Sequence, residues 1–140
     1  MASLFTRIIA GELPARFVWK DEQCVAFLTI APLRPGHTLV VPRKEVDHWI
    51  DLEPPLAAHL LGAARSIGRA LMDGFRPAKV GMTVVGLEVP HVHLHLVPIN
   101  SVRDMDFARQ DAGAKPADLD AAAATIRASL RRLGCPQVAD

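Results

Sequence analysis

The sequence predicts a single α+β domain, with a mainly antiparallel sheet and two helices. Three observations support this fold class: short β-rich segments follow one another, one long segment with a helical apolar stripe interrupts them, and most turns between strands are short. Short turns join antiparallel neighbours, whereas a parallel crossover needs about a dozen residues or more. Helices should therefore cover one face of the sheet and leave the other face available to a ligand or partner.

Five segments have the composition of strands. They are rich in β-branched and aromatic residues, and charged or Pro- and Gly-containing turns separate them. In chain order they are Phe17–Lys20, Gln23–Thr29, His37–Pro42, Val80–Val85 and His91–Pro98. The sequence therefore predicts a five-stranded sheet whose last strand carries three histidines.

The connection between the third and fourth predicted strands should contain a long helix over residues 51–74. Apolar residues recur there at three- and four-residue steps, namely Leu56, Leu60, Ala63, Ile67 and Leu71. Pro54 and Pro55 suit a first helical turn, and Gly74 should end the helix in a left-handed cap. His59 lies off this apolar stripe, so its side chain should face solvent.

A second helix is predicted over residues 117–133. Its apolar face would consist of Leu119, Ala123, Ile126, Leu130 and Leu133. Aspartates near its start and arginines near its end suit the helix macrodipole. Residues 99–116 show no clear period and are predicted to form a loop.

Composition and charge restrict the possible functions. The chain has 140 residues, 50% hydrophobic and 22% charged, which suits one domain over residues 1–140. Sixteen Lys and Arg nearly balance 15 Asp and Glu, so we expect neither nucleic acid nor membrane as a partner. A phosphate ligand would therefore need a local site.

The localisation expected from the sequence is cytoplasmic. No apolar run approaches the roughly 20 residues of a membrane span, and the N-terminus lacks the features of a signal peptide. Cys24 and Cys135 form neither a C-x-x-C motif nor a disulfide framework, which favours a reducing compartment.

The segment PHVHLHLVP places a histidine at every second position. In a strand, His91, His93 and His95 would share one face, with neighbours about 6.5–7 Å apart, while the aliphatic residues between them point to the core. Imidazoles titrate near neutrality, so such a row can supply a nucleophile, a proton donor and hydrogen bonds to phosphate.

Three interpretations of this row stay open on the residues alone. It can be a solvated strand face, a metal site, or a centre for nucleophilic phosphorus chemistry. A metal site needs a further ligand, and the following VPINSVRDMDF offers no glutamate at a suitable spacing. Three histidines of one strand also span too far to reach one tetrahedral ion easily, so phosphorus chemistry is favoured.

The chain resembles the histidine-triad (HIT) superfamily. HVHLHLV matches its H-φ-H-φ-H-φ-φ signature, where φ is apolar, and GLEVPHVHLHLVP is similar to the longer segment around that signature. The stretch from LFTRIIAGELP to PGHTLVVPRK resembles the N-terminal half of the Hint-like branch. The resemblance covers about residues 3–99; the loop and helix of residues 100–135 lie outside it.

The resemblance implies a homodimeric nucleotidyl hydrolase or transferase. It would cleave at the α-phosphate of a purine nucleoside 5′-phosphate derivative, such as a phosphoramidate, through a covalent nucleotidyl-histidine. His93 would be the nucleophile, oriented by the backbone carbonyl of His91. His95 would bind the phosphate or the leaving group, and His37 would complete the proton network.

The resemblance also implies a nucleotide pocket and no cofactor. Its residues would be Leu4, Phe5, Ile8, Phe27, Thr29, Ile30, Glu88 and Val89. From pattern alone the apolar members are better explained as core, so this assignment depends on the resemblance. We expect little discrimination between purines, because stacking and apolar contacts would dominate.

Several positions depart from the family pattern. Thr29 stands where relatives carry an Asp that binds the ribose hydroxyls, Leu87 where a Gln is common, and Val80 where an amide residue lies near the phosphate. Each lost polar contact is worth roughly 0.5–1.5 kcal/mol. We therefore expect the reaction at the histidines to be retained and the binding of the nucleotide to be altered.

No structural zinc is expected. Some relatives bind zinc through an N-terminal cysteine pair, whereas this chain has Ser3, Thr6 and Glu45 near the corresponding places. Two alternative functions stay open: a nucleotide-binding or interaction protein with vestigial hydrolysis, and a dinucleoside polyphosphate hydrolase.

Overall fold

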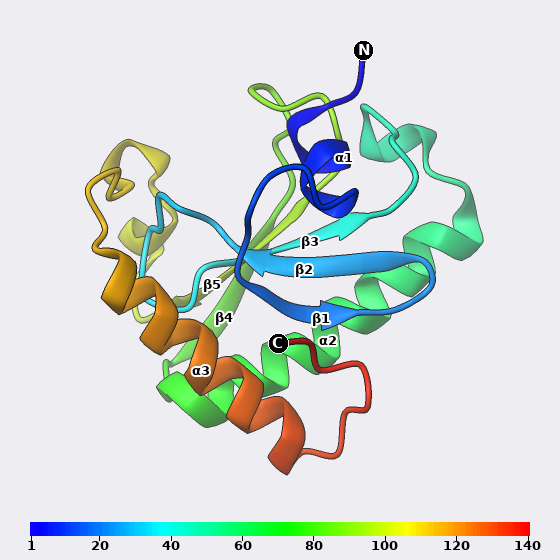
Figure 1. Ribbon diagram of the computed structural model, residues 1–140. Helices are drawn as coiled ribbons and strands as arrows, with labels where there is room; N and C mark the ends of the chain where they lie inside the picture. Colours follow the sequence, from blue (N-terminus) through cyan, green and yellow to red (C-terminus); the bar gives the residue numbers. More distant parts are fainter.

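The computed structural model describes the whole chain, Met1–Asp140, and confirms the α+β fold (Figure 1). Its five strands form one sheet in the order β1-β2-β3-β5-β4, and every neighbouring pair is antiparallel. The strands are β1 (Phe17–Lys20), β2 (Cys24–Leu28), β3 (Thr38–Pro42), β4 (Lys79–Thr83) and β5 (Leu94–Ile99). All five predicted strands are present, and their ends differ from the prediction by up to three residues.

The helices are α1 (Leu4–Ile9), α2 (Pro54–Phe75) and α3 (Pro116–Arg132). Both predicted helices are confirmed as α2 and α3, which pack against each other on one side of the sheet (Figure 1). None of the helices has the length and apolar character needed to cross a membrane. The predicted loop of residues 99–116 contains two short 3-10 turns, Val102–Met105 and Phe107–Arg109.

Helix α1 was not predicted. Six residues are too few for an apolar period to be recognised, but the start of the helix follows ordinary capping chemistry. The Ser3 hydroxyl accepts a hydrogen bond from the Thr6 backbone N–H at 3.0 Å. Phe5 and Ile8 then point from this helix into the protein, where they are 5% and 8% exposed.

Apolar side chains fill both sides of the sheet. The larger cluster lies between the sheet and the two long helices, and it includes Val92, Leu94 and Leu96. A smaller cluster lies under α1 on the other side and consists of Phe5, Ile8, Val25, Phe27, Leu39 and Val41. The face that we expected to be open is therefore partly covered by α1.

The prediction for Gly74 was wrong. Helix α2 continues through Phe75, and the left-handed residue that follows it is Arg76, with φ 51°. Gly74 instead lies where α2 meets α3, and a Cβ there would come within 2.8 Å of Thr125 Cγ2. The glycine is thus explained by close helix packing.

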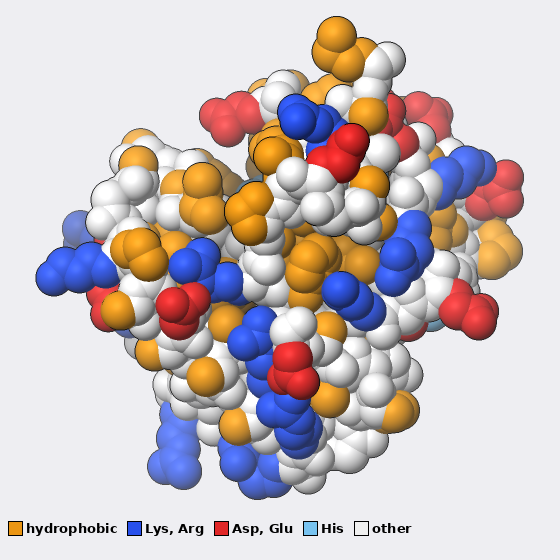
Figure 2. All heavy atoms as spheres, viewed as in Figure 1, with side chains coloured by type: hydrophobic (Ala, Val, Ile, Leu, Met, Phe, Trp, Pro, Cys, Tyr) orange, Lys and Arg blue, Asp and Glu red, His pale blue; other side chains and the backbone are white.

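The surface carries no segregated charge on the side that Figure 2 shows. Acidic side chains lie among the basic ones, and apolar side chains are interspersed between them. This distribution agrees with the formal charge of +1. It offers no broad electrostatic attraction to a polyanion.

Candidate active site

The three histidines of HVHLHL do not all lie in a strand, as the sequence had predicted. Strand β5 begins at Leu94, so only His95 belongs to it, and His91 and His93 lie in the irregular segment just before. The alternation is nevertheless retained, because Val92, Leu94 and Leu96 all enter the larger core cluster. The histidines occupy the other side and are 0%, 7% and 8% exposed.

Cross-strand pairing places His95 on the same face of the sheet as the small core cluster. His95 pairs with Leu39 of β3, and Leu39 pairs with Phe27 of β2. Directly paired residues share a face of a sheet. The strand register therefore brings His95 to the face that α1 partly covers.

The hydrogen bonds of His93 define its free nitrogen. His93 Nδ1 lies 2.7 Å from the backbone oxygen of His91. A carbonyl oxygen can only accept, so Nδ1 carries the proton and Nε2 of the neutral ring has a free lone pair. Every buried side-chain nitrogen and oxygen has a hydrogen-bond partner, whereas His93 Nε2 makes no hydrogen bond, so this atom is open to the surface.

The same reasoning gives the proton positions of His37 and His95. The backbone N–H of Leu33 donates to His37 Nδ1 at 3.0 Å, so the proton of a neutral His37 is on Nε2. His37 Nε2 lies 2.9 Å from His95 Nδ1 and donates to it. The proton of His95 is then on its Nε2, which is free to donate to a ligand.

His91 is held from both ring nitrogens. Its Nε2 lies 2.8 Å from the backbone oxygen of Pro42 and must donate to it. Its Nδ1 accepts from the Ser3 hydroxyl at 2.7 Å. Because the His91 carbonyl orients His93, these two hydrogen bonds also help to place the nucleophile candidate.

The start of α1 is tied to this arrangement by Glu45. Glu45 Oε1 accepts from the Ser3 backbone N–H at 2.6 Å and from the Thr6 hydroxyl at 2.7 Å. These hydrogen bonds keep the pKa of Glu45 below its usual value, at about 2. The positions discussed for zinc in relatives are therefore joined in this chain by hydrogen bonds that end on His91.

Burial lowers the pKa of all four histidines, because it disfavours the charged imidazolium. The pKa of His37 falls to about 3 and that of His95 to about 4; burial is the main cause, and the neighbouring histidines contribute to both shifts. The pKa values of His91 and His93 are also lowered by burial. All four rings are thus neutral at pH 7, and a nucleophilic role of His93 would require no prior loss of a proton.

Two aromatic rings flank the histidines. The Phe5 ring centroid lies 4.8 Å from that of His93, edge to face, and the Phe107 centroid lies 4.9 Å from that of His95. Phe107 was missed in the sequence because it lies in a segment without periodicity. Only the fold brings its 3-10 turn beside β5.

Thr83 is a second residue that the sequence did not single out. It lies at the end of β4 directly opposite His95, so both side chains are on one face. Val80, which we had placed near the phosphate, pairs with Pro98 and packs against the larger core cluster on the helix side. That interpretation of Val80 was wrong, and Thr83 is the polar β4 residue next to the histidines.

The predicted nucleotide-binding residues fall into different environments. Phe5, Ile8 and Phe27 belong to the small core cluster, against which Val89 also packs. Leu4 and Ile30 are exposed, at 47% and 75%, and Glu88 and Leu87 are exposed too. Thr29 is half-buried, and its hydroxyl accepts from the Ala31 backbone N–H at 3.2 Å.

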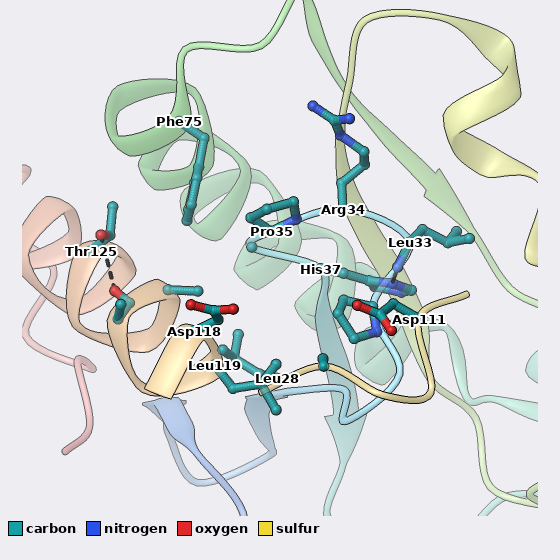
Figure 3. A pocket seen from close by; sticks show the side chains of 15 residues that line it. Leu28, Leu33, Arg34, Pro35, His37, Phe75, Asp111, Asp118, Leu119 and Thr125 are labelled. Atoms are coloured by element: carbon teal, nitrogen blue, oxygen red, sulfur yellow. Dashed lines mark hydrogen bonds between the residues drawn. The ribbon is translucent and has the colours of Figure 1, made fainter. Parts of the chain in front are cut away.

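A cavity of about 390 Å³ lies on the other side of His37, between the loop after β2, the end of α2 and the start of α3. Figure 3 shows the His37 ring at one wall, with Phe75 of α2 and Asp118 and Leu119 of α3 around the space. His91, His93 and His95 do not line it. Of the four histidines, only His37 therefore contacts this cavity.

Comparison with known proteins shows the family. A model described as the HIT domain matches residues 10–102. The protein hit of Bacillus subtilis is 34% identical over 102 residues, which cover 68% of this chain and 69% of that protein. An uncharacterised HIT-like protein of Methanocaldococcus jannaschii is 35% identical over 99 residues. The match covers 68% of this chain and 77% of that protein. The chain belongs to the HIT domain family.

Solved structures agree with this assignment. A zinc-bound histidine triad family protein from Mycobacterium smegmatis superposes with a TM-score of 0.82 at 27% identity, covering 95% of this chain and 96% of that one. A HIT family protein from Bacillus subtilis gives 0.69 at 30% identity, covering 90% and 95%. Proteins of this family are generally nucleotide hydrolases or transferases. The Hint-like branch stays a prediction.

Proposed function

We propose that this chain is a nucleotidyl hydrolase or transferase that acts at the α-phosphate of a purine nucleoside 5′-phosphate derivative. Phosphoramidates are the favoured substrates. One observation carries the proposal: His93 presents a free Nε2 lone pair, while the neighbouring His95 presents a free Nε2–H. Their ring centroids are 4.8 Å apart, so one phosphoryl group can meet both.

The first step forms a bond between His93 Nε2 and the α-phosphorus. The bond from phosphorus to the leaving group breaks, and its electron pair goes to the leaving group, which takes a proton from water. The positive charge that develops on the His93 ring is stabilised by the His91 carbonyl, which accepts from Nδ1–H at 2.7 Å. His95 Nε2–H donates to a phosphoryl oxygen or to the leaving atom.

The second step releases the nucleotide. Water attacks the phosphorus, the phosphorus–nitrogen bond breaks, and its electron pair returns to His93 Nε2. One proton of that water passes to solvent. A transferase would use another hydroxyl or phosphate in place of water. The roles of His93 and His95 would be the same in both reactions.

The nucleotide is proposed to lie over the α1 side of the sheet. Phe5 connects this region to the triad, because its ring contacts both Phe27 and His93. Leu4 and Ile30 would cover the base with exposed apolar surface, and Thr29, Glu88 and Val89 would lie nearer the sugar and phosphate. The proposed chemistry uses only the histidine side chains and the His91 carbonyl, and we propose no cofactor.

The test compares His93→Asn with the matched control His48→Asn. His48 is exposed and caps a 3-10 turn by accepting from the Ile50 N–H, a role that asparagine can also fill. With adenosine and guanosine 5′-phosphoramidates, His93→Asn should lose turnover and the acid-labile nucleotidyl-protein adduct, and His48→Asn should keep both. Undiminished turnover in folded His93→Asn would reject the proposed nucleophile.

A second candidate function is nucleotide binding with vestigial hydrolysis. Thr29 favours it, because its hydroxyl is already engaged by the Ala31 N–H and would hold a ribose diol poorly. Calorimetric binding of AMP and GMP, measured beside turnover, separates the two. Binding without turnover across the phosphoramidate panel would favour this alternative.

We also propose that the chain, acting as one domain over residues 1–140, forms a homodimer through β4. This strand is at the edge of the sheet, and exposed apolar side chains lie on it and just after it in the chain: Met82, Val85 and Leu87. Unpaired strand edges with apolar side chains are typical sites of association. Light scattering of the wild type and of Met82→Lys tests this; a monomeric wild type would reject it.

A further inference from the structure

Three side chains with metal-binding donor atoms meet on the helix side of the sheet, away from the histidine triad. Asp21 lies in the turn between β1 and β2, Cys24 begins β2, and His59 comes from α2. One donor atom from each lies within 4.8 Å of the others. Cys24 is fully buried, and the His59 side chain, which we had expected to face solvent, is only 31% exposed.

The sequence led us to expect no structural zinc, but the geometry leads elsewhere: we propose that Asp21, Cys24 and His59 form a binding site for a divalent transition metal, with zinc the best match. Zinc prefers thiolate, imidazole and carboxylate ligands in a tetrahedral arrangement, with donor atoms about 3.3–3.6 Å apart at the usual bond lengths. Here Asp21 Oδ2 lies 3.4 Å from Cys24 Sγ and 2.8 Å from His59 Nε2. Small side-chain rotations suffice to reach the tetrahedral spacing.

The charges of this donor set match a divalent ion. One thiolate and one carboxylate neutralise two positive charges, and the imidazole adds none, so the occupied site would be neutral. Neutrality matters because an uncompensated charge is costly to bury. A soft sulfur ligand also favours zinc over magnesium or calcium, which prefer oxygen.

Outer contacts already orient the ligands. Asp21 Oδ1 accepts from the backbone N–H groups of Gln23 and Cys24, both at 2.8 Å, which turns Oδ2 toward the other two donors. The Gln23 side-chain amide lies 3.1 Å from His59 Nδ1. The amide nitrogen Nε2 is the atom that faces Nδ1 in the structure. A flip of this amide would turn its oxygen toward the ring, where it would accept from Nδ1–H and leave His59 Nε2 free for a metal.

Binding of the metal displaces the proton of the Cys24 thiol. Burial is the main cause that raises the pKa of Cys24 to about 12, so without a metal the thiol keeps its proton. On binding, that proton passes to solvent and a sulfur–metal bond replaces the S–H bond. A metal bound at His59 Nε2 leaves the ring proton on Nδ1, and a water fills the fourth position.

A bound metal ion would stabilise the packing of two elements of the fold. The ion would join the β1–β2 turn to α2 and so strengthen the contact between the sheet and its long helix. The site adjoins a shallow open hollow lined by Lys20, Asp21, Glu22 and Arg43, through which an ion can enter. This inference does not depend on the proposed nucleotide chemistry.

Cobalt titration of the untagged, metal-free full chain tests the site. We expect one Co²⁺ per chain, visible bands of tetrahedral intensity, and a thiolate-to-cobalt charge-transfer band in the near ultraviolet, all lost when Zn²⁺ is added. Cys24→Ser should abolish the charge-transfer band. His59→Gln should weaken Co²⁺ binding by at least about tenfold, the lower end of the cost of losing even an outer partner of a metal.

Two controls separate this site from other histidines. His48→Gln and His93→Asn should both keep the charge-transfer band and the affinity of the wild type. A wild type without the band would overturn the proposal, and so would a band that survives Cys24→Ser or that disappears in His93→Asn.

A thermal measurement keeps the test valid if Cys24→Ser does not fold. The His59 side chain is partly exposed on α2, at 31%, so His59→Gln should fold. Zn²⁺ should raise the Tm of the wild type and have little effect on that of His59→Gln, because a ligand stabilises only the state that binds it. Equal rises in both proteins would count against the site.

Discussion

His37 Nε2 lies 2.9 Å from His95 Nδ1, and the N–H of Leu33 on the far side of His37 fixes which of the two rings donates. A residue far away in sequence thereby sets the tautomer of the histidine next to the proposed nucleophile. His37 does not need to meet the substrate to matter, because it decides that His95 presents an N–H.

His37→Ala should therefore lower kcat without a comparable change in KM. Without the Nε2–H of His37, His95 is free to place its proton on either nitrogen, and the donor toward the phosphoryl group is lost part of the time. We expect a loss on the order of 10–100-fold, below the 10²–10⁴-fold of direct proton transfer. Steady-state kinetics on a phosphoramidate measure it; an unchanged kcat would contradict the role of His37.

Stability should fall as the pH decreases from 6.5 toward 4. The folded-state pKa values of His37 and His95 are about 3 and about 4, below the ordinary 6.5, so in this window the unfolded chain binds protons that the folded chain does not. The unfolded state is therefore favoured on acidification, by up to about 1.4 kcal/mol per pH unit for each such histidine. Urea unfolding at pH 7, 6 and 5 measures this slope.

His37→Phe supplies the control for that slope. It removes one buried titrating ring and should flatten the pH dependence between 6.5 and 5. The lowered pKa values of Asp21 and Glu45 act only at more acidic pH and do not interfere. An equal slope in wild type and variant would show that His37 titrates normally in the folded chain.

Glu45→Gln should reduce kcat more than it changes KM. Glu45 holds the Ser3 N–H and the Thr6 hydroxyl, and Ser3 in turn donates to His91, whose carbonyl orients His93. We expect a reduction of about tenfold, since the loss acts through supporting contacts. Glu22→Gln, at an exposed glutamate, is the matched control. An equal effect in both variants would contradict the role of Glu45 in positioning His93.

Gly74→Ala and Gly68→Ala should change stability in opposite directions. Both glycines lie inside α2, but an added Cβ at position 74 would come within 2.8 Å of Thr125 Cγ2, whereas nothing lies within 4 Å at position 68. Gly74→Ala should cost about 1–3 kcal/mol through overpacking. Gly68→Ala should add about 0.5–1 kcal/mol, because alanine favours the helix. Denaturant midpoints compare the two, and equal signs would contradict the packing explanation.

The departures from the predicted fold have local causes. Helix α1 escaped notice because six residues show no period, although Ser3 is an ordinary N-cap. Gly74 was taken for a helix end because glycine is common there, and only the approach of α3 reveals its role. Val80 was assigned to the phosphate from the family resemblance, but the pairing of β4 with β5 puts Thr83, and not Val80, opposite His95.

The sequence by itself determined the α+β class, the two long helices, the five strands and the segregation of three histidines from three aliphatic residues. These features follow from local periodicity, which a chain carries whatever its final shape. The tertiary structure alone decided which ring nitrogens are free and which residues meet: His37 with His95, Ser3 with His91, and Cys24 with Asp21 and His59. Such contacts join residues up to 88 positions apart, and their hydrogen bonds exist only once the core has closed around them.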